Sequence, residues 1–362
     1  MKIVIGIGHP AHVHFFRNFI EIFQKKGHEV MIVARDKEVT RNLLEKYSLN
    51  YELFGGHRQK MLAKLLEIPQ NDHIFYKAVK KFRPDILLGI NNYTSAHIGA
   101  ITGIPSIIFT DTEEAPLGNI ATFPFATTIC TPSCFLKDLG VKQVRYPGYH
   151  ELAYLHPNYF TPDETVLNQL GISKGENYIL LRFISWAASH DIGLSGMRAD
   201  SVNSIIRSFE ERGHVFISSE RPLDPALEKY RLKTPPEKIH SLMYYAGLYM
   251  GEGGTMAAEA AILGTPAIHV ESDAKGNATG NSSGNFRELR DRFGLLYYFA
   301  DQNDAFAKAS EILDNKNSKP DWQHKRENLL REKIDVTAWM TDFIENYPES
   351  FQRYQNEKRI SS

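Results

Sequence analysis

Residues 251–266 read GEGGTMAAEAAILGTP, in which paired glycines separate a short apolar run from an alanine-rich run typical of a helix. A strand that turns through glycines into a helix points backbone amides at one spot, and the helix dipole favours an anion there. We therefore expect Gly253, Gly254 and Thr255 to hold phosphate groups. Glu259, one turn further along, is placed to accept hydrogen bonds from ribose hydroxyls. The alternative is a tight turn whose small residues serve only helix packing.

On both sides of this segment, apolar β-branched runs alternate with amphipathic runs. Strands separated by helices at this spacing indicate βαβ units and parallel sheets. Functional loops are then expected at the carboxyl ends of the strands. Strands are predicted at Lys2–Gly8, Glu29–Ala34, Ile86–Ile90, Ser106–Thr110, Thr127–Thr131, Tyr178–Ile184, Val215–Ser218, Leu248–Met250 and Ala267–Val270, and helices at Phe15–Lys26, Lys37–Tyr47, Asn71–Phe82, Ser201–Arg212, Glu237–Tyr245 and Met256–Leu263.

The length of the chain, 362 residues, favours two α/β domains over a single core. The alternation breaks between residues 148 and 162, where Tyr, His, Pro and Asn residues gather, and this segment predicts the domain junction. We expect domains at residues 1–150 and 151–340, with residues 341–362 as a C-terminal helix crossing back to the first domain. The whole stretch from about residue 303 to 359 has a helical pattern.

Charge and cysteine content narrow the class of protein. Lys and Arg total 42 and Asp and Glu total 43, so no excess of charge points to a nucleic acid partner. The sequence has neither an apolar run long enough to span a membrane nor the features of a signal peptide. The two cysteines, Cys130 and Cys134, are expected to be reduced thiols. These features predict a cytoplasmic protein.

Three histidines follow the first predicted strand, in the loop Gly6–Phe15. The loop fits the dinucleotide pattern G-x-G-x-x-A, but Pro10 and the histidines are unusual in a pyrophosphate turn. A metal site is also disfavoured, because no carboxylate or cysteine lies nearby in sequence. We expect His9, His12 or His14 to act as a hydrogen-bond donor or general base, or else to cap the helix that begins there.

Two further loops carry candidate polar groups. Asp111 and Glu113 follow the strand Ser106–Phe109 and are candidates for a base or for a ligand of substrate hydroxyls, unless they are simply solvated. Arg182 and Ser185 end the first strand of the second half and are candidates for phosphate contacts, with Trp186 as a stacking surface.

Most of the chain resembles the GT-B architecture, in which two Rossmann-like domains with parallel sheets face a central cleft. Gly253, Gly254 and Glu259 resemble the phosphate glycines and the ribose-binding glutamate of UDP-N-acetylglucosamine 2-epimerases and of the lipid-linked N-acetylglucosaminyltransferase of peptidoglycan synthesis. The run Pro10–Phe16 is similar to the motif Pro-(Ala/Pro)-His-Val-His-Phe-Phe, which opens a bacterial and archaeal glycosyltransferase-like family of unknown function. The segment 146–151 lies where these relatives have their hinge.

The chain departs from the epimerases at two places. Their Gly-Thr-Arg-Pro-Glu motif is replaced by Gly8–His12, and the serine before their paired glycines is replaced by Glu252. A carboxylate beside bound phosphates is unfavourable if it points inward. We therefore expect Glu252 to point away or to be protonated, or the ligand to differ from a standard diphosphate.

The resemblance implies a metal-independent glycosyltransferase that needs no cofactor. Its donor would be a nucleotide-diphosphate sugar, with UDP favoured, in cell-surface polysaccharide synthesis. Arg182 and Ser185 would offset the charge of the leaving group, and His14, His12 or Asp111 would deprotonate an unknown acceptor. The alternatives are a non-hydrolysing 2-epimerase that uses acidic residues such as Glu113, and a non-catalytic nucleotide-sugar-binding protein. We expect the aromatic run Phe15–Phe23 to be buried, and the alternative is a peripheral membrane contact through this run.

Overall fold

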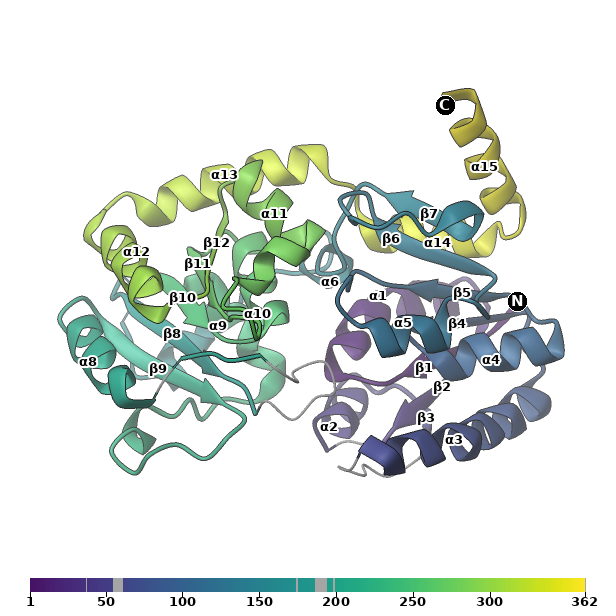
Figure 1. Ribbon diagram of the computed structural model, residues 1–362, viewed down its shortest axis with the longest axis horizontal. Coiled ribbons are helices and arrows are strands. Elements are labelled where there is room, and N and C mark those ends of the chain that lie inside the picture. Colours follow the sequence, from purple (N-terminus) through teal and green to yellow (C-terminus); the bar gives the residue numbers. More distant parts are fainter. Residues whose placement is uncertain (37, 55–60, 174, 186–193, 198, 362) are drawn as a thin grey trace. The chain divides into compact units, whose positions relative to one another are not determined.

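The computed structural model describes residues 1–362 except 37, 55–60, 174, 186–193, 198 and 362. The chain forms two compact units (Figure 1), one made of Met1–Tyr159 with Ile334–Ser362 and the other of Phe160–Lys333. These limits differ by several residues from the predicted 150 and 340. Residues 152–155 belong to the first unit because the carbonyl of Ala153 accepts hydrogen bonds from the side chains of Asn18 at 2.9 Å and Thr337 at 2.7 Å.

Unit 1 contains a seven-stranded parallel sheet in the order β3-β2-β1-β4-β5-β6-β7. Five of its strands follow the predicted apolar runs, whereas β3 and β7 were not predicted, since polar side chains interrupt their apolar pattern. The strands are β1 (Lys2–Ile7), β2 (Glu29–Arg35), β3 (Tyr51–Phe54), β4 (Ile86–Ile90), β5 (Ser106–Phe109), β6 (Thr128–Pro132) and β7 (Gln143–Tyr146).

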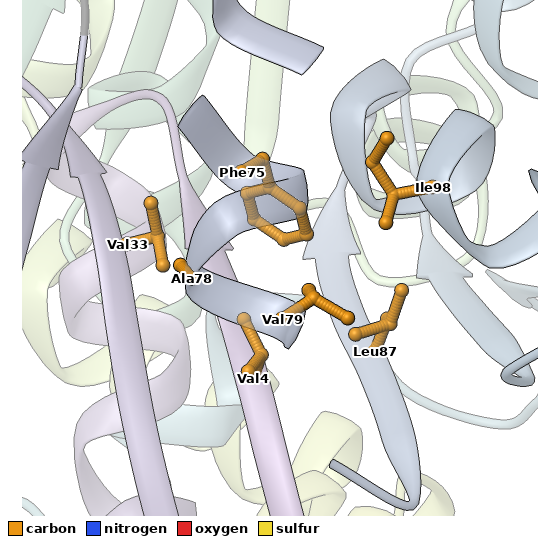
Figure 2. Packing of buried hydrophobic residues seen from close by; sticks show 7 residues of the cluster. All are labelled: Val4, Val33, Phe75, Ala78, Val79, Leu87 and Ile98. Atoms are coloured by element: carbon orange, nitrogen blue, oxygen red, sulfur yellow. The ribbon is translucent and has the colours of Figure 1, made fainter. Parts of the chain in front are cut away.

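Helices cover this sheet, and Figure 2 shows the packing of one face, where α3 and α4 meet β1, β2 and β4. The buried side chains there are aliphatic apart from Phe75. On α1 the aromatic residues from Phe15 to Phe23 are also buried, as favoured, and this leaves none of them for a membrane. The helices of unit 1 are α1 (Pro10–Lys25), α2 (Glu38–Lys46), α3 (Met61–Phe82), α4 (Tyr93–Thr102), α5 (Pro116–Thr122), α6 (Leu152–Leu155), α14 (Val336–Glu345) and α15 (Glu349–Ser361).

Unit 2 contains a five-stranded parallel sheet in the order β12-β11-β10-β8-β9. The four predicted strands are confirmed, and β12 is an addition. The strands are β8 (Tyr178–Phe183), β9 (His214–Ser219), β10 (Leu248–Gly251), β11 (Ala267–Val270) and β12 (Leu296–Phe299), and the helices are α7 (Thr165–Gln169), α8 (Ala199–Glu210), α9 (Ile239–Tyr245), α10 (Gly254–Ile262), α11 (Gly284–Asp291), α12 (Gln302–Asp314) and α13 (Ser318–Glu332).

The strand order of each sheet identifies where a ligand is most easily held. In unit 1 the order reverses between β1 and β4, and in unit 2 it reverses between β8 and β10. At such a reversal the loops that follow the two strands leave in opposite directions and open a crevice at the carboxyl edge. In the described part of the chain, no helix combines the length and the apolar character needed to cross a membrane.

Candidate functional site

The paired glycines of unit 2 form a strand–turn–helix at the reversal between β8 and β10, as predicted. Gly253 has a φ of +79°, which glycine adopts without strain, and caps α10, with no side-chain cap among the described residues. A Cβ at Gly253 would lie 2.9 Å from Cγ2 of Ile184. Thr255 lies exposed in the first turn of the helix. The turn therefore places the amino end of α10, with its positive dipole end, at the carboxyl edge of the sheet.

Glu252, for which the sequence analysis left three alternatives, is fully buried, and both of its carboxylate oxygens contact backbone amides of the residues after β8. Its Oε2 accepts a hydrogen bond from the backbone amide of Ile184 at 3.0 Å, and its Oε1 accepts one from the amide of Met197 at 2.9 Å. The Arg221 guanidinium lies 3.4 Å from Oε1. Burial raises the pKa of Glu252, against the opposing effect of the two amides and Arg221.

Arg182 and Ser185 are brought together by a carboxylate that the sequence analysis did not consider. The Arg182 guanidinium donates to Ser218 Oγ at 2.8 Å and pairs with Glu220. The amide and the hydroxyl of Ser185 each lie 3.3 Å from Oε2 of Glu220. Glu220 directly follows β9, and its place at a strand end was the available signal. Trp186 lies outside the described residues.

Glu259 is buried on α10 and is engaged within the protein. Its Oε1 lies 3.0 Å from Nε2 of His240, which is also buried, on α9. Their side chains are only 5% and 3% exposed, so the pair is shielded from competing water. His240 was missed because a single histidine within a helical pattern carries no signal of its own.

β11 and α11 also contribute residues next to the Gly253–Gly254 turn. His269 pairs in register with Gly251, and its ring lies edge-on to that of Phe286 at 5.1 Å. A Cβ at Gly254 would lie 3.4 Å from the same phenylalanine. His269 Nε2 is 3.4 Å from the Thr279 hydroxyl, while Nδ1 is buried with no partner among the described residues. Such an unsatisfied polar atom is uncommon and is typical of a place where water or a ligand binds.

In unit 1 the structure pairs Asp111, which follows β5, with His150, which follows β7. Asp111 Oδ2 lies 3.3 Å from His150 Nδ1, and the Asp111 side chain is 22% exposed. His150 is buried, its Nε2 has no partner among the described residues, and its ring lies 4.7 Å from that of Phe15. Burial lowers the pKa of His150 although Asp111 opposes this effect, so the neutral imidazole is favoured.

The other predicted bases of unit 1 lie in different surroundings. His14 is buried beside the rings of Tyr47 and Tyr154. Glu113 is buried, and its Oε1 accepts a hydrogen bond from the amide of Leu136 at 3.0 Å. His12 is half-buried, and its Nδ1 lies 3.3 Å from the amide of Gly8. Of the predicted bases of unit 1, Asp111, His12 and the helix-capping His9 keep exposed surface.

The histidine loop shows two local roles. His9 caps α1 by accepting a hydrogen bond from the amide of Ala11 at 3.2 Å, so the capping alternative is confirmed for this residue. Gly6 leaves room for Asn92, since a Cβ there would lie 2.5 Å from Asn92 Nδ2. This close approach accounts for Gly6 without a pyrophosphate. The described residues contain no group of three or more His, Cys, Asp or Glu side chains that could hold a metal ion.

A family model described as "Protein of unknown function (DUF354)" matches residues 1–275. The chain belongs to this family. It is 25% identical over 281 residues to the uncharacterized protein MJ0665 of Methanocaldococcus jannaschii, covering 74% of this chain and 81% of that protein. It is also 24% identical over 139 residues to a UDP-N-acetylglucosamine–N-acetylmuramyl-(pentapeptide) pyrophosphoryl-undecaprenol N-acetylglucosamine transferase of Halothermothrix orenii, covering 36% of this chain and 38% of the transferase.

Among solved structures, the fold is similar to that of the UDP-GlcNAc 2-epimerase from Neisseria meningitidis bound to UDP-GlcNAc. The TM-score is 0.70 at 12% identity, over 95% of this chain and 99% of that one. At this identity the likeness concerns the fold alone. Together with the two parallel sheets, it confirms the predicted GT-B class with two Rossmann-like units.

Proposed function

We propose that this protein is a glycosyltransferase-like enzyme whose donor is a nucleotide-diphosphate sugar and whose product is part of a cell-surface glycan. The observation that carries the proposal is the Gly253–Gly254 turn, which opens α10 at the reversal point of the unit 2 sheet. A diphosphate suits this place because backbone amides and the helix dipole both favour negative charge. The transferase relative and the epimerase fold, solved with UDP-GlcNAc, support a nucleotide sugar and favour UDP.

In this proposal unit 2 binds the donor. Gly253, Gly254 and Thr255 hold the diphosphate, and Glu259, oriented by His240, accepts hydrogen bonds from the ribose. Arg182 and Ser185 stabilise the departing diphosphate. Because Glu220 already contacts both, the phosphate oxygens must compete with Glu220 for these donors.

The base is proposed to come from unit 1, with Asp111 as the first choice. Its partly exposed carboxylate accepts the proton of an acceptor hydroxyl as that oxygen attacks the anomeric carbon and the diphosphate leaves. The neutral His150 donates Nδ1–H to Asp111 and orients it. No metal and no cofactor take part. His12 is the second choice, and the buried His14 is the least suited of the predicted bases.

A 2-epimerase is the second candidate, favoured by the likeness to an epimerase structure. Its proposed acid, Glu113, is buried and holds the amide of Leu136, which argues against a role in proton transfer. A non-catalytic nucleotide-sugar-binding protein is the third candidate.

We propose a cytoplasmic location for the protein.

The test begins with calorimetric titration of UDP, GDP, CDP, dTDP and their sugars into the full chain, with Glu259→Ala as the variant. Binding of one nucleotide, weakened in the variant, supports the donor site. The sugar that binds is then incubated alone and with candidate acceptors, and its products are followed by NMR. A new glycosidic bond supports a transferase, and a change at C2 without an acceptor supports an epimerase. Absence of binding across the panel contradicts the proposal.

A further inference from the structure

Glu252 is a fully buried carboxylate directly before the Gly253–Gly254 turn, and its hydrogen bonds link that turn to the residues after β8. It holds the amide of Ile184, whose side chain in turn packs over the bare Cα of Gly253. Through its other oxygen it holds the amide of Met197. The position of this carboxylate therefore determines how closely Ile184 approaches the turn.

The charges around Glu252 nearly balance before any ligand binds. Arg221 follows β9, and its guanidinium lies 3.4 Å from Oε1 of Glu252. This side chain is half-exposed and lies over the ring of Phe183. His269 on β11 and Glu271, which directly follows that strand, also lie nearby, with 3.8 Å between His269 Nε2 and Glu271 Oε1. The negative charge of Glu271 disfavours the charged form of Glu252.

Two further charged groups lie at the same edge, Arg182 on β8 and its partner Glu220 after β9, and they offset each other. From β10, Tyr249 carries a buried hydroxyl and is neutral because burial raises its pKa far above the usual range. Arg221 is thus the one cation that faces Glu252 among the described residues. An anion bound at the next residue adds negative charge beside Glu252. Among the described residues, the charge of the other nearby cation, Arg182, is already offset by Glu220, so the added charge favours the protonated carboxyl.

We propose that Glu252 is a positioning residue whose protonation is coupled to binding of a diphosphate at the Gly253–Gly254 turn. When the anion binds, Glu252 takes up a proton from solvent and loses its charge. Its oxygens still accept from the amides of Ile184 and Met197, so the wall beside the turn keeps its shape. The identity of the anion rests on the function proposed above; the coupling rests on the geometry of Glu252.

The test measures protons taken up per ligand bound. A nucleotide sugar is a suitable probe, and we choose UDP-N-acetylglucosamine, because both its phosphates are esterified and neither titrates near neutral pH. Calorimetry in two buffers of different ionisation enthalpy gives the proton uptake, and titrations between about pH 6 and about pH 8 give the affinity. For wild type we expect net uptake of a fraction of a proton. Because binding takes up a proton, we also expect Kd to rise as the pH is raised, by at most about tenfold per pH unit.

Glu252→Gln removes the titrating group while keeping the size and one acceptor oxygen. We expect its Kd to be independent of pH and its proton uptake to vanish. Glu327→Gln is the matched control, because Glu327 is 66% exposed on α13 of the same unit. It should retain the wild-type uptake. If Glu252→Gln does not fold, Arg221→Met serves instead, and loss of this cation should move the uptake curve to higher pH.

Two results overturn the coupling while leaving the proposed function intact. One is tight binding by wild type without proton uptake, and the other is undiminished uptake in a folded Glu252→Gln protein, which would assign the proton to His269 or Glu271. If neither UDP-N-acetylglucosamine nor any other nucleotide sugar binds to wild type, the donor site and the coupling both fail.

Discussion

His150 Nδ1 lies 3.3 Å from Asp111 Oδ2, and this contact joins the loops that follow β5 and β7 in unit 1. The histidine is buried, whereas the carboxylate keeps 22% of its surface exposed. Burial lowers the pKa of His150 and so favours its neutral imidazole, which lies against the Asp111 carboxylate and limits its movement. Asp111 is therefore oriented by a neighbour and still accessible, which is what a general base requires.

Asp111→Asn should lower kcat by about 10²- to 10⁴-fold, because an amide cannot accept the proton of the acceptor. Nucleotide affinity should stay unchanged, since the donor site is proposed in unit 2. Glu114→Gln is the control, because Glu114 lies in the same loop and is 66% exposed. Turnover by Asp111→Asn at the wild-type rate would contradict the assignment and turn attention to His12.

His150→Phe should lower kcat by less than Asp111→Asn does. Without the imidazole, the Asp111 carboxylate loses the neighbour that orients it, so the loss should appear in kcat and not in nucleotide affinity. His150→Asn supplies an amide donor at a similar place and should restore part of the rate. A kcat unchanged in His150→Phe would mean that the histidine only packs against Phe15.

The pair Glu259–His240 predicts discrimination between ribose and deoxyribose. Wild type should bind the ribonucleotide at least about tenfold more tightly than its 2′-deoxy form, since a hydrogen bond to a charged group contributes about 1.5–3 kcal/mol. His240→Phe should reduce this ratio because the carboxylate loses its orienting partner, whereas His240→Gln keeps a donor and should retain more of it. Calorimetry on both nucleotides measures the ratio. A ratio unaffected by His240→Phe would leave His240 with a structural role only.

The sequence predicted most strands of both sheets because they are compact apolar runs. Runs such as Lys2–Ile7 and Tyr178–Phe183 are recognisable without tertiary information. The strands β3 and β7 were missed because polar residues interrupt their short apolar pattern, and β12 was missed because its sequence, Leu-Tyr-Tyr-Phe, contains no β-branched residue. Their stability comes from the neighbouring strand, which a local pattern does not contain.

The site was predictable where it is local and unpredictable where it depends on contacts between distant residues. The glycine turn is contiguous in sequence, so its geometry followed from residue type. The partners of its side chains are not: His240 lies 19 positions from Glu259, and Glu220 lies 35 from Ser185. Glu252 shows the same limit, because the two backbone amides that it accepts from, those of Ile184 and Met197, lie 68 and 55 positions away in the sequence.

Gly253→Ala and Gly276→Ala separate backbone strain from collision at the turn. Both glycines are in unit 2, with φ of +79° and +80°, but a Cβ at Gly253 would meet Ile184 at 2.9 Å while one at Gly276 meets nothing within 4 Å. Gly276→Ala should cost about 1–2 kcal/mol from left-handed strain alone and leave binding intact. Gly253→Ala should cost more and weaken nucleotide binding. Equal unfolding free energies and equal Kd values for the two variants would contradict a special role for the turn.

The fit of Asn92 against Gly6 can be tested by a double-mutant cycle in unit 1. Asn92 Oδ1 accepts from the amide of Ser95 at 2.8 Å and caps α4, so Asn92→Ala should cost about 0.5–2 kcal/mol. Gly6→Ala should also destabilise, because its Cβ would lie 2.5 Å from Asn92 Nδ2, while Gly8→Ala, whose nearest contact is His12 at 3.8 Å, should cost little. In the Asn92→Ala background the collision is gone, so Gly6→Ala should then be nearly neutral. Chemical denaturation measures all four proteins of the cycle. Additive effects would mean that Gly6 is required for another reason, and the rejected pyrophosphate turn at residues 6–11 would have to be reconsidered.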